Sequence, residues 1–128
     1  VFPVVEENNI AFMSWGTFDK GILTGRVTAD RVFEKTDVRS WAPWLKKKYK
    51  QPRLTAMETI SALLAREHYS ALELAIGYVL QYSIVATALC GIRNQHQLET
   101  CLTAFDHLPP ENLISECRSI AEGIIRAG

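Results

Sequence analysis

The chain has 128 residues, 48% of them hydrophobic, and its 14 basic and 14 acidic residues leave no formal net charge. This length suits one hydrophobic core and is too short for two full domains. The neutral charge, and the lack of any apolar run of roughly 18 residues, argue against nucleic acid and membranes as partners, so we expect a cytoplasmic protein.

Residues 1–9 have the pattern of the end of a helix, and the Asn8-Asn9 pair is expected to terminate it. Because the chain starts with Val1 rather than Met, we expect that sequence precedes it or that it is a truncated product. Residues 10–15 form a short apolar run before a glycine. This run predicts a strand that is buried on both faces.

Residues 17–53 carry glycines, prolines and charges without any period, which predicts a long loop. Helical signals follow this segment. Thr55 with Glu58, and Ser70 with Glu73, fit the capping box, in which a hydroxyl and a glutamate cover backbone N–H groups at a helix start. The sequence therefore predicts two helices here, and the apolar residues of the second cover more than one face.

Residues 84–92 form a second apolar run, which predicts another strand. Asn94 resembles a further helix cap, and apolar residues then repeat at helical spacing through residues 98–105. Pro109-Pro110 is expected to start the last helix. The buried stripe of that helix is predicted to consist of Leu113, Cys117, Ile120, Ala121 and Ile124.

Strands that alternate with helices indicate a parallel sheet of the α/β class, because parallel neighbours need a crossover connection. Two strands cannot complete such a sheet, so we expect strands from missing sequence, or from another copy of the chain, to cover these two. A missing N-terminal portion or a homo-oligomer would both meet this need.

Each predicted strand leads into a glycine-containing loop, at residues 14–26 and at residues 90–97. The carboxyl ends of parallel strands meet at one edge of a sheet, and the second loop opens a helix, whose N-terminus favours an anion. The pair of loops makes binding of a phosphorylated cofactor the leading functional hypothesis.

Other ligands fit the sequence less well. The three cysteines lack metal-ligand spacing and the three histidines are scattered, so we expect no metal site and treat the cysteines as small apolar residues. The basic run at residues 46–50, with Trp41 and Trp44 nearby, is typical of a nucleic-acid contact, but the neutral charge favours a solvated loop.

Four segments, in order, resemble the aldo-keto reductase family. Residues 10–26 are similar to its seventh-strand segment, residues 70–81 to the helix that follows, and residues 91–99 to its eighth-strand exit, Gly-x-Arg/Ser-x-x-x-Gln-Leu-x-x-Asn. Residues 108–111 add a fourth, weaker match. The resemblance covers essentially the whole chain.

The resemblance implies that residues 1–128 are one segment, the C-terminal part of a (β/α)₈ TIM barrel from helix six onward, with two parallel strands plus helices. This part is incomplete as a barrel on its own. It also implies the cofactor NADP(H), with the loop of residues 17–53 over the cofactor site. The residues it assigns to cofactor binding are Trp15, Gly16, Thr17, Phe18, Lys20, Arg26, Arg39, Gly91, Arg93 and Gln97.

Within that set, the resemblance gives Trp15 the role of stacking on the nicotinamide and residues 16–20 positions around the pyrophosphate. Arg26 and Arg39 belong to the loop that folds over it, and residues 91–97 surround the adenosine 2′-phosphate and adenine. Physical chemistry supports these roles, because an indole offers a flat face to a cation and an arginine at a helix start clamps a phosphate.

The chain departs from the family pattern at two places. Gly16-Thr17 replaces Ser-Pro, which removes the fixed φ of a proline, and Cys101 replaces an asparagine that contacts adenine. The family's catalytic Asp, Tyr, Lys and His come from earlier strands, and no segment here matches their motifs. We therefore expect no catalytic residue in this chain and no hydride transfer by the chain alone.

Three functional hypotheses follow. The first is the cofactor-binding part of an NADP(H)-dependent oxidoreductase whose complete form reduces a small aldehyde or ketone. The second is a truncated, non-catalytic module that associates with itself or with another protein through exposed strand edges. The third is a free-standing nucleotide-binding protein.

Overall fold

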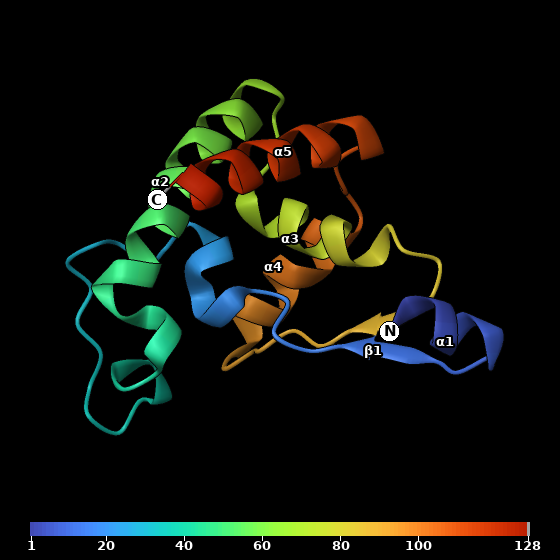
Figure 1. Ribbon diagram of the computed structural model, residues 1–128, viewed down its shortest axis with the longest axis horizontal. Helices are drawn as coiled ribbons and strands as arrows, with labels where there is room; N and C mark the ends of the chain where they lie inside the picture. Colours follow the sequence, from blue (N-terminus) through green and yellow to red (C-terminus); the bar gives the residue numbers. More distant parts are fainter. Residues whose placement is uncertain (128) are drawn as a thin grey trace.

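The computed structural model describes residues 1–127 and has a helix-rich α/β architecture (Figure 1). Two short strands lie at one side, and the longer helices pack together at the other. In chain order the elements are α1 (Phe2–Glu7), β1 (Phe12–Ser14), the 3₁₀ segments η1 (Asp19–Thr24), η2 (Val38–Ser40) and η3 (Pro43–Leu45), α2 (Lys47–Arg66), α3 (Ala71–Leu80), β2 (Val85–Ala88), α4 (Gln95–Phe105) and α5 (Glu111–Ala127).

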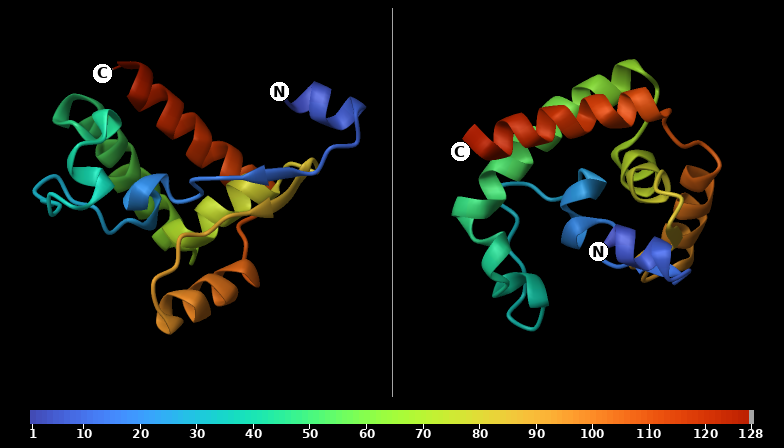
Figure 2. Two further views of the ribbon diagram at one scale, coloured as in Figure 1. Left: turned by 90° about the horizontal axis from the view of Figure 1, so that it is seen from below. Right: turned by 45° about the vertical axis from the view of Figure 1, so that its right-hand side comes forward.

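The two strands pair in parallel, as the sequence predicts, with Phe12 opposite Val85 and Ser14 opposite Ala88. Figure 2 shows them side by side. The N–H of Leu89 extends the ladder by donating to the carbonyl of Ser14 at 2.9 Å. Because the strands are parallel, both chain segments leave the sheet at the same edge.

The expectation that the first strand is buried on both faces is wrong. Met13 is 63% exposed, and Ile10 also faces solvent. The physical reason is the width of the sheet: it has two strands within residues 1–127, and α3 packs against β2. Side chains on an uncovered face of β1 stay in contact with solvent.

The hydrophobic core lies between the helices rather than around the sheet. Helices α2 and α5 lie side by side, and η1 and α3 pack against this pair (Figures 1 and 2). The core includes Ile22, Leu54, Ile60, Leu64, Leu74, Leu113, Ile114 and Cys117. The prediction that Leu113 and Cys117 belong to the buried stripe of the last helix is therefore confirmed.

Helix α2 begins much earlier than predicted. The segment 17–53 is not a continuous loop, because it contains η1, η2 and η3 and the first turns of α2. Pro52 lies inside the helix, near its start, where its missing N–H removes a single bond to the preceding turn. Burial of Lys50 and Leu54 favours the helix there, and the Lys50 Nζ donates to the carbonyl of Ala29 at 2.7 Å.

The cap predicted at Thr55 is also wrong, since this residue lies in the interior of α2, where its carbonyl accepts a hydrogen bond from the Thr59 hydroxyl. The cap at Ser70 is confirmed: its hydroxyl accepts from the Glu73 N–H at 3.2 Å, and the Glu73 carboxylate accepts from the Ser70 N–H. The capping pattern alone does not distinguish a helix start from a helix interior.

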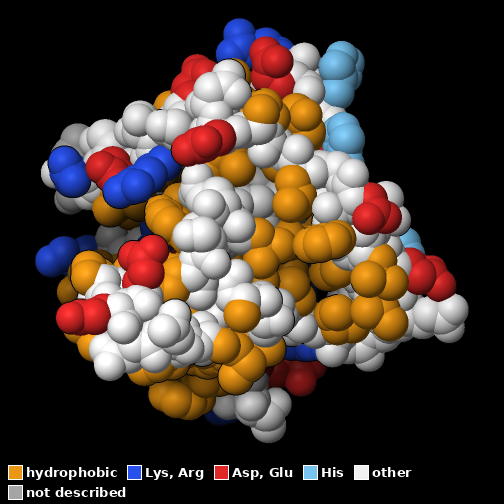
Figure 3. Space-filling view, turned by 90° about the vertical axis from the view of Figure 1, so that its right-hand side faces the viewer, with side chains coloured by type: hydrophobic (Ala, Val, Ile, Leu, Met, Phe, Trp, Pro, Cys, Tyr) orange, Lys and Arg blue, Asp and Glu red, His pale blue; other side chains and the backbone are white. Residues whose placement is uncertain are grey.

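Several apolar side chains stay on the surface. In α4, Leu98, Leu102 and Phe105 repeat at helical spacing but face solvent, and Leu102 is 59% exposed. Figure 3 shows hydrophobic side chains gathered over one side of the molecule. No helix among residues 1–127 is both long enough and apolar enough to cross a membrane.

Two helical glycines give a matched test of the packing between α3 and α5. A Cβ at Gly77 would lie 3.3 Å from Ile114 Cδ1 and 3.3 Å from Pro109 Cδ, whereas a Cβ at Gly123 would meet nothing within 4 Å. We predict that Gly123→Ala stabilises the chain by about 1 kcal/mol through helix propensity. Gly77→Ala is expected to be less stable than Gly123→Ala, because overpacking costs roughly 1–3 kcal/mol.

Urea unfolding followed by circular dichroism measures both variants. Equal stabilisation by the two substitutions would contradict the tight contact between α3 and α5.

Candidate functional site

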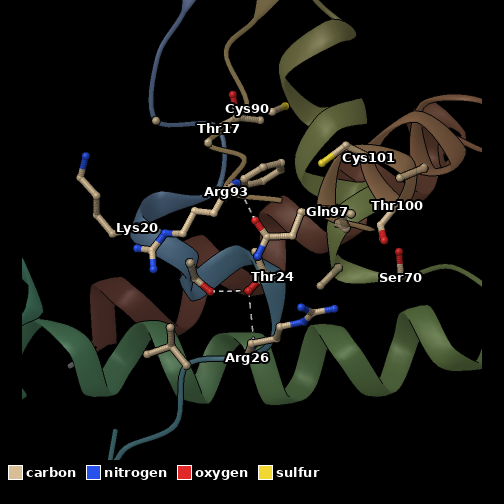
Figure 4. Close-up of a pocket in the computed structure, with 18 of the residues that line it drawn as sticks. Thr17, Lys20, Thr24, Arg26, Ser70, Cys90, Arg93, Gln97, Thr100 and Cys101 are labelled. Carbon is tan, nitrogen blue, oxygen red and sulfur yellow. Dashed lines mark hydrogen bonds between the residues drawn. The ribbon is translucent and has the colours of Figure 1, made fainter. Parts of the chain in front are cut away.

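The two strand exits line one cavity of about 1030 Å³, together with the first turn of α3 and one side of α4 (Figure 4). We call this space the exit cleft. All ten residues assigned to a cofactor from the sequence line it: Trp15, Gly16, Thr17, Phe18, Lys20, Arg26, Arg39, Gly91, Arg93 and Gln97. The structure thus brings together two segments that are more than seventy positions apart, since Thr17 and Leu89 are in direct contact.

Thr17 joins the two exits. Its hydroxyl donates to the carbonyl of Leu89 at 3.0 Å, and the residue is only 4% exposed. Gly16, just before it, has a φ of 80°, a conformation that side chains disfavour and that turns the chain toward Thr17. Together with the bond from Leu89 to Ser14, this contact fixes the spacing of the two loops.

The loop after β1 turns through a left-handed segment. Asp19, Lys20 and Gly21 have φ values of 41°, 57° and 100°. An ion pair at 3.1 Å between Asp19 and Arg53 attaches this segment to α2. The Lys20 Nζ lies 3.9 Å from the ring centre of Trp15, which is 77% exposed. A cation–π contact at such an exposed place contributes about 0.5–1 kcal/mol, so a ligand can replace it at little cost.

Arg39 is held by neighbours on its own loop. Its guanidinium forms an ion pair and a fork of hydrogen bonds with Asp37, and it stacks over Phe33 at 4.4 Å. The hydrogen bonds from Arg39 hold the pKa of Asp37 well below its usual range, and the charge of Arg93 adds to this effect. Asp37 therefore stays ionised and keeps Arg39 in place at the rim of the exit cleft.

The start of α4 forms the other corner of the exit cleft. The Asn94 side chain accepts from the Gln97 N–H at 2.9 Å, and the Gln97 Oε1 accepts from the Arg93 N–H at 2.8 Å. The predicted cap at Asn94 is therefore confirmed, and Gln97 orders the loop as well as lining the cleft. The N–H groups of Gln95 and His96 have no partner within the helix, so this end of α4 favours an anion.

Cations exceed anions in the exit cleft although the chain as a whole is neutral. Arg31 adds to the four basic residues expected from the sequence, against Glu73 and Glu99. Sequence reasoning missed Arg31 because it lies in an irregular loop with no motif. Within residues 1–127, Lys20, Arg26 and Arg93 form no salt bridge, so their charges are available to a ligand.

The cysteines divide into two kinds. Cys117 is 2% exposed, and burial raises its pKa to about 11. It packs as a small apolar residue of the core, as predicted. Cys90 and Cys101 instead are partly exposed and line the exit cleft. They are therefore not core residues in the described part of the chain. In the part of the chain that the structure describes, no group of three or more His, Cys, Asp or Glu residues could hold a metal ion.

Comparison with known proteins gives a consistent result. A profile of the Aldo/keto reductase family matches residues 1–122. The aldo-keto reductase YhdN of Bacillus subtilis is 32% identical over 101 residues, which are 77% of this chain and 30% of that protein. The solved structure of the glycerol dehydrogenase AKR11B4 from Gluconobacter oxydans matches 98% of this chain with a TM-score of 0.84 and 26% identity. The chain covers 38% of that structure, so its fold corresponds to part of a barrel.

The capping box at the edge of the exit cleft gives a pH prediction. Burial alone would raise the pKa of Glu73, but hydrogen bonds from Ser70 and His107 outweigh it and lower the pKa from its usual 4.5. A lowered pKa means that ionised Glu73 stabilises the fold above pH 4.5 and that this stabilisation is lost as the pH falls through the folded-state value.

We predict that Glu73→Gln is less stable than the parent at neutral pH and that the difference shrinks as the medium becomes acidic. Ser70→Ala serves as the comparison, because loss of the cap costs about 1 kcal/mol even when Glu73 is protonated. Thermal unfolding between neutral and acidic pH measures both. A difference between parent and Glu73→Gln that does not change with pH would contradict this role of the carboxylate.

Proposed function

Since the chain belongs to the aldo/keto reductase family, we propose that it is the cofactor-binding part of an oxidoreductase that uses NADP(H) to reduce an aldehyde or ketone. The chain spans about a third of the length of the relatives it matches. The activity and the small carbonyl substrate are therefore proposed for the whole protein, and a cytoplasmic location remains a prediction.

One observation carries the proposal: the exit cleft places Lys20, Arg26 and Arg93 together at the carboxyl edge of the sheet. This donor set fits a dinucleotide that carries several phosphates. Cations unpaired within the described residues and the N-terminus of α4 both favour anions, and a guanidinium at that end can form two hydrogen bonds to one phosphate.

The residues of the exit cleft have separate roles in this proposal. Arg93 binds the 2′-phosphate that distinguishes NADPH from NADH, while Gln97 keeps the Arg93 backbone in place. Lys20 and Arg26 neutralise the pyrophosphate, and the indole of Trp15 supports the nicotinamide. When bound, the nicotinamide ring supplies the hydride that the reduction consumes.

The acid–base residues are proposed to lie outside this chain. Of the side chains with suitable chemistry, Lys20 and His96 line the exit cleft, whereas His68, Tyr49 and Tyr78 do not. His68 is exposed just after α2, and Tyr78 packs against Tyr82 at 6.0 Å between ring centres. Proton transfer needs a group within hydrogen-bond reach of the reacting carbonyl, and these side chains do not converge on one point.

Arg93→Ala tests the proposal. We expect the parent chain to bind NADPH more tightly than NADH, and the variant to lose this preference through weaker NADPH binding alone. A charge-assisted hydrogen bond contributes about 1.5–3 kcal/mol, which corresponds to a loss of roughly ten- to a hundredfold in affinity. Fluorescence titration of both nucleotides measures the effect.

Arg66→Ala is the matched control, because Arg66 is exposed in the last turn of α2 and does not line the exit cleft. It is expected to leave both affinities unchanged. Equal binding of NADPH and NADH by the parent, or equal weakening of both by Arg93→Ala, would contradict the role given to Arg93.

The exposed apolar surface favours a second candidate, in which the chain associates with itself or another protein. Met13, Leu102 and Phe105 are 63%, 59% and 56% exposed. Figure 3 shows that hydrophobic side chains gather over one face of the molecule. We expect light scattering to find a concentration-dependent oligomer and Leu102→Glu to shift it toward the monomer. A parent chain that stays monomeric at every concentration would rule out self-association.

A further inference from the structure

Cys90 and Cys101 face each other across a corner of the exit cleft. Cys90 follows β2 by two residues, and Cys101 lies in the second turn of α4. Both are partly exposed and both line the exit cleft. Figure 4 shows the two sulfur atoms pointing toward one another from the loop and from the helix.

The two thiols also influence each other. Burial, and then the neighbouring Cys101, raise the pKa of Cys90. Burial also raises the pKa of Cys101, and the contact with Cys90 opposes this rise without cancelling it. Both thiols therefore keep a raised pKa, and Cys101 is the one whose thiolate the contact favours relative to burial alone. The thiolate is the form that attacks an oxidant.

We propose that Cys90 and Cys101 are a redox modification site, which a hydroperoxide converts into a disulfide between the β2 exit and α4. The site rests on two thiols that face one cavity and point at one another. The third thiol, Cys117, is buried in the helical core and takes no part.

The reaction balances with a hydroperoxide as the oxidant. The Cys101 thiolate attacks one peroxide oxygen, the O–O bond breaks, and the other oxygen leaves as water or alcohol after taking up a proton. The Cys90 sulfur then attacks the sulfenic acid formed on Cys101, the S–S bond forms, and the sulfenic oxygen leaves as water with the Cys90 proton. The two sulfurs are oxidised by one electron each, and the two oxygens are reduced by one each.

The expected effect on nucleotide binding rests on the proposed NADP(H) site, whereas the formation of the disulfide does not. The bridge would enclose residues 91–100, the segment that carries Arg93 and Gln97. A disulfide holds its two Cα atoms about 4–7 Å apart and would therefore fix α4 to the β2 exit. We expect this cross-link to restrict the corner proposed for the 2′-phosphate and adenine and to weaken nucleotide binding.

The first experiment maps the bridge. The folded chain is treated with hydrogen peroxide, its remaining thiols are blocked, and it is cut after glutamate. Cleavage after Glu99, Glu111 and Glu116 places the three cysteines on different peptides. We expect a cross-linked pair holding Cys90 and Cys101, reversed by dithiothreitol, with Cys117 recovered as a blocked thiol.

As a control, the chain is oxidised after it has been unfolded in urea. The fold then no longer selects the pair, and we expect Cys117 to form disulfides with Cys90 and Cys101 as well. Cys101→Ala, checked for folding by circular dichroism, is expected to leave Cys90 without an intramolecular partner. Absence of the pair in folded chain, or the same mixture of bridges as in urea, would overturn the proposal.

The second experiment titrates NADPH into reduced and oxidised chain. We expect oxidised chain to bind roughly tenfold more weakly or worse, with recovery after reduction, and bound NADPH to slow formation of the bridge. Equal affinity in the two forms would refute the consequence for binding. Reduced chain that binds no NADPH would contradict the proposed function instead, and peptide mapping alone would then decide on the disulfide.

Discussion

The parallel pairing of β1 with β2 is the constraint on which the rest of the site depends. Because the strands run in the same direction, their exits meet at one edge, and the Thr17 hydroxyl fixes the gap by donating to Leu89 at 3.0 Å. The N-terminus of α4 then lines the same exit cleft as Lys20. An antiparallel pair would place the two glycine loops at opposite edges, and no common anion site would form.

The molecule separates the parts that hold it together from the parts proposed to contact a ligand. The helical core around α2 and α5 buries most of the apolar side chains, whereas the sheet stays partly open to solvent. Ion pairing of Arg53 with Asp19, and the bond from Lys50 to Ala29, anchor the irregular loop on α2. The exit cleft is thus positioned by α2 and α5, which contribute no side chain to its lining, so the charge of the cleft can vary without loss of the core.

Local signals were enough to predict the elements that are fixed by local contacts. The caps at Ser70 and Asn94 could be predicted from their local pattern, and the parallel pair from the alternation of strands with helices. The start of α2 could not, since burial of Leu54 outweighs the signal of Pro52. The ten residues that the resemblance assigned all line the exit cleft, but the contact of Lys20 with Trp15 depends on the left-handed turn between them, and the approach of Cys90 to Cys101 depends on how α4 packs. No local sequence pattern indicates either.

The central claim is that both strand exits bind one dinucleotide at the same time. Amide hydrogen exchange with and without NADPH tests it directly, because a ligand that spans the exit cleft must protect both loops together. The account predicts slower exchange at residues 15–20 and at residues 91–97, with the same dependence on NADPH concentration, and no change in α5. Protection of a single loop, or different concentration dependences for the two, would contradict it.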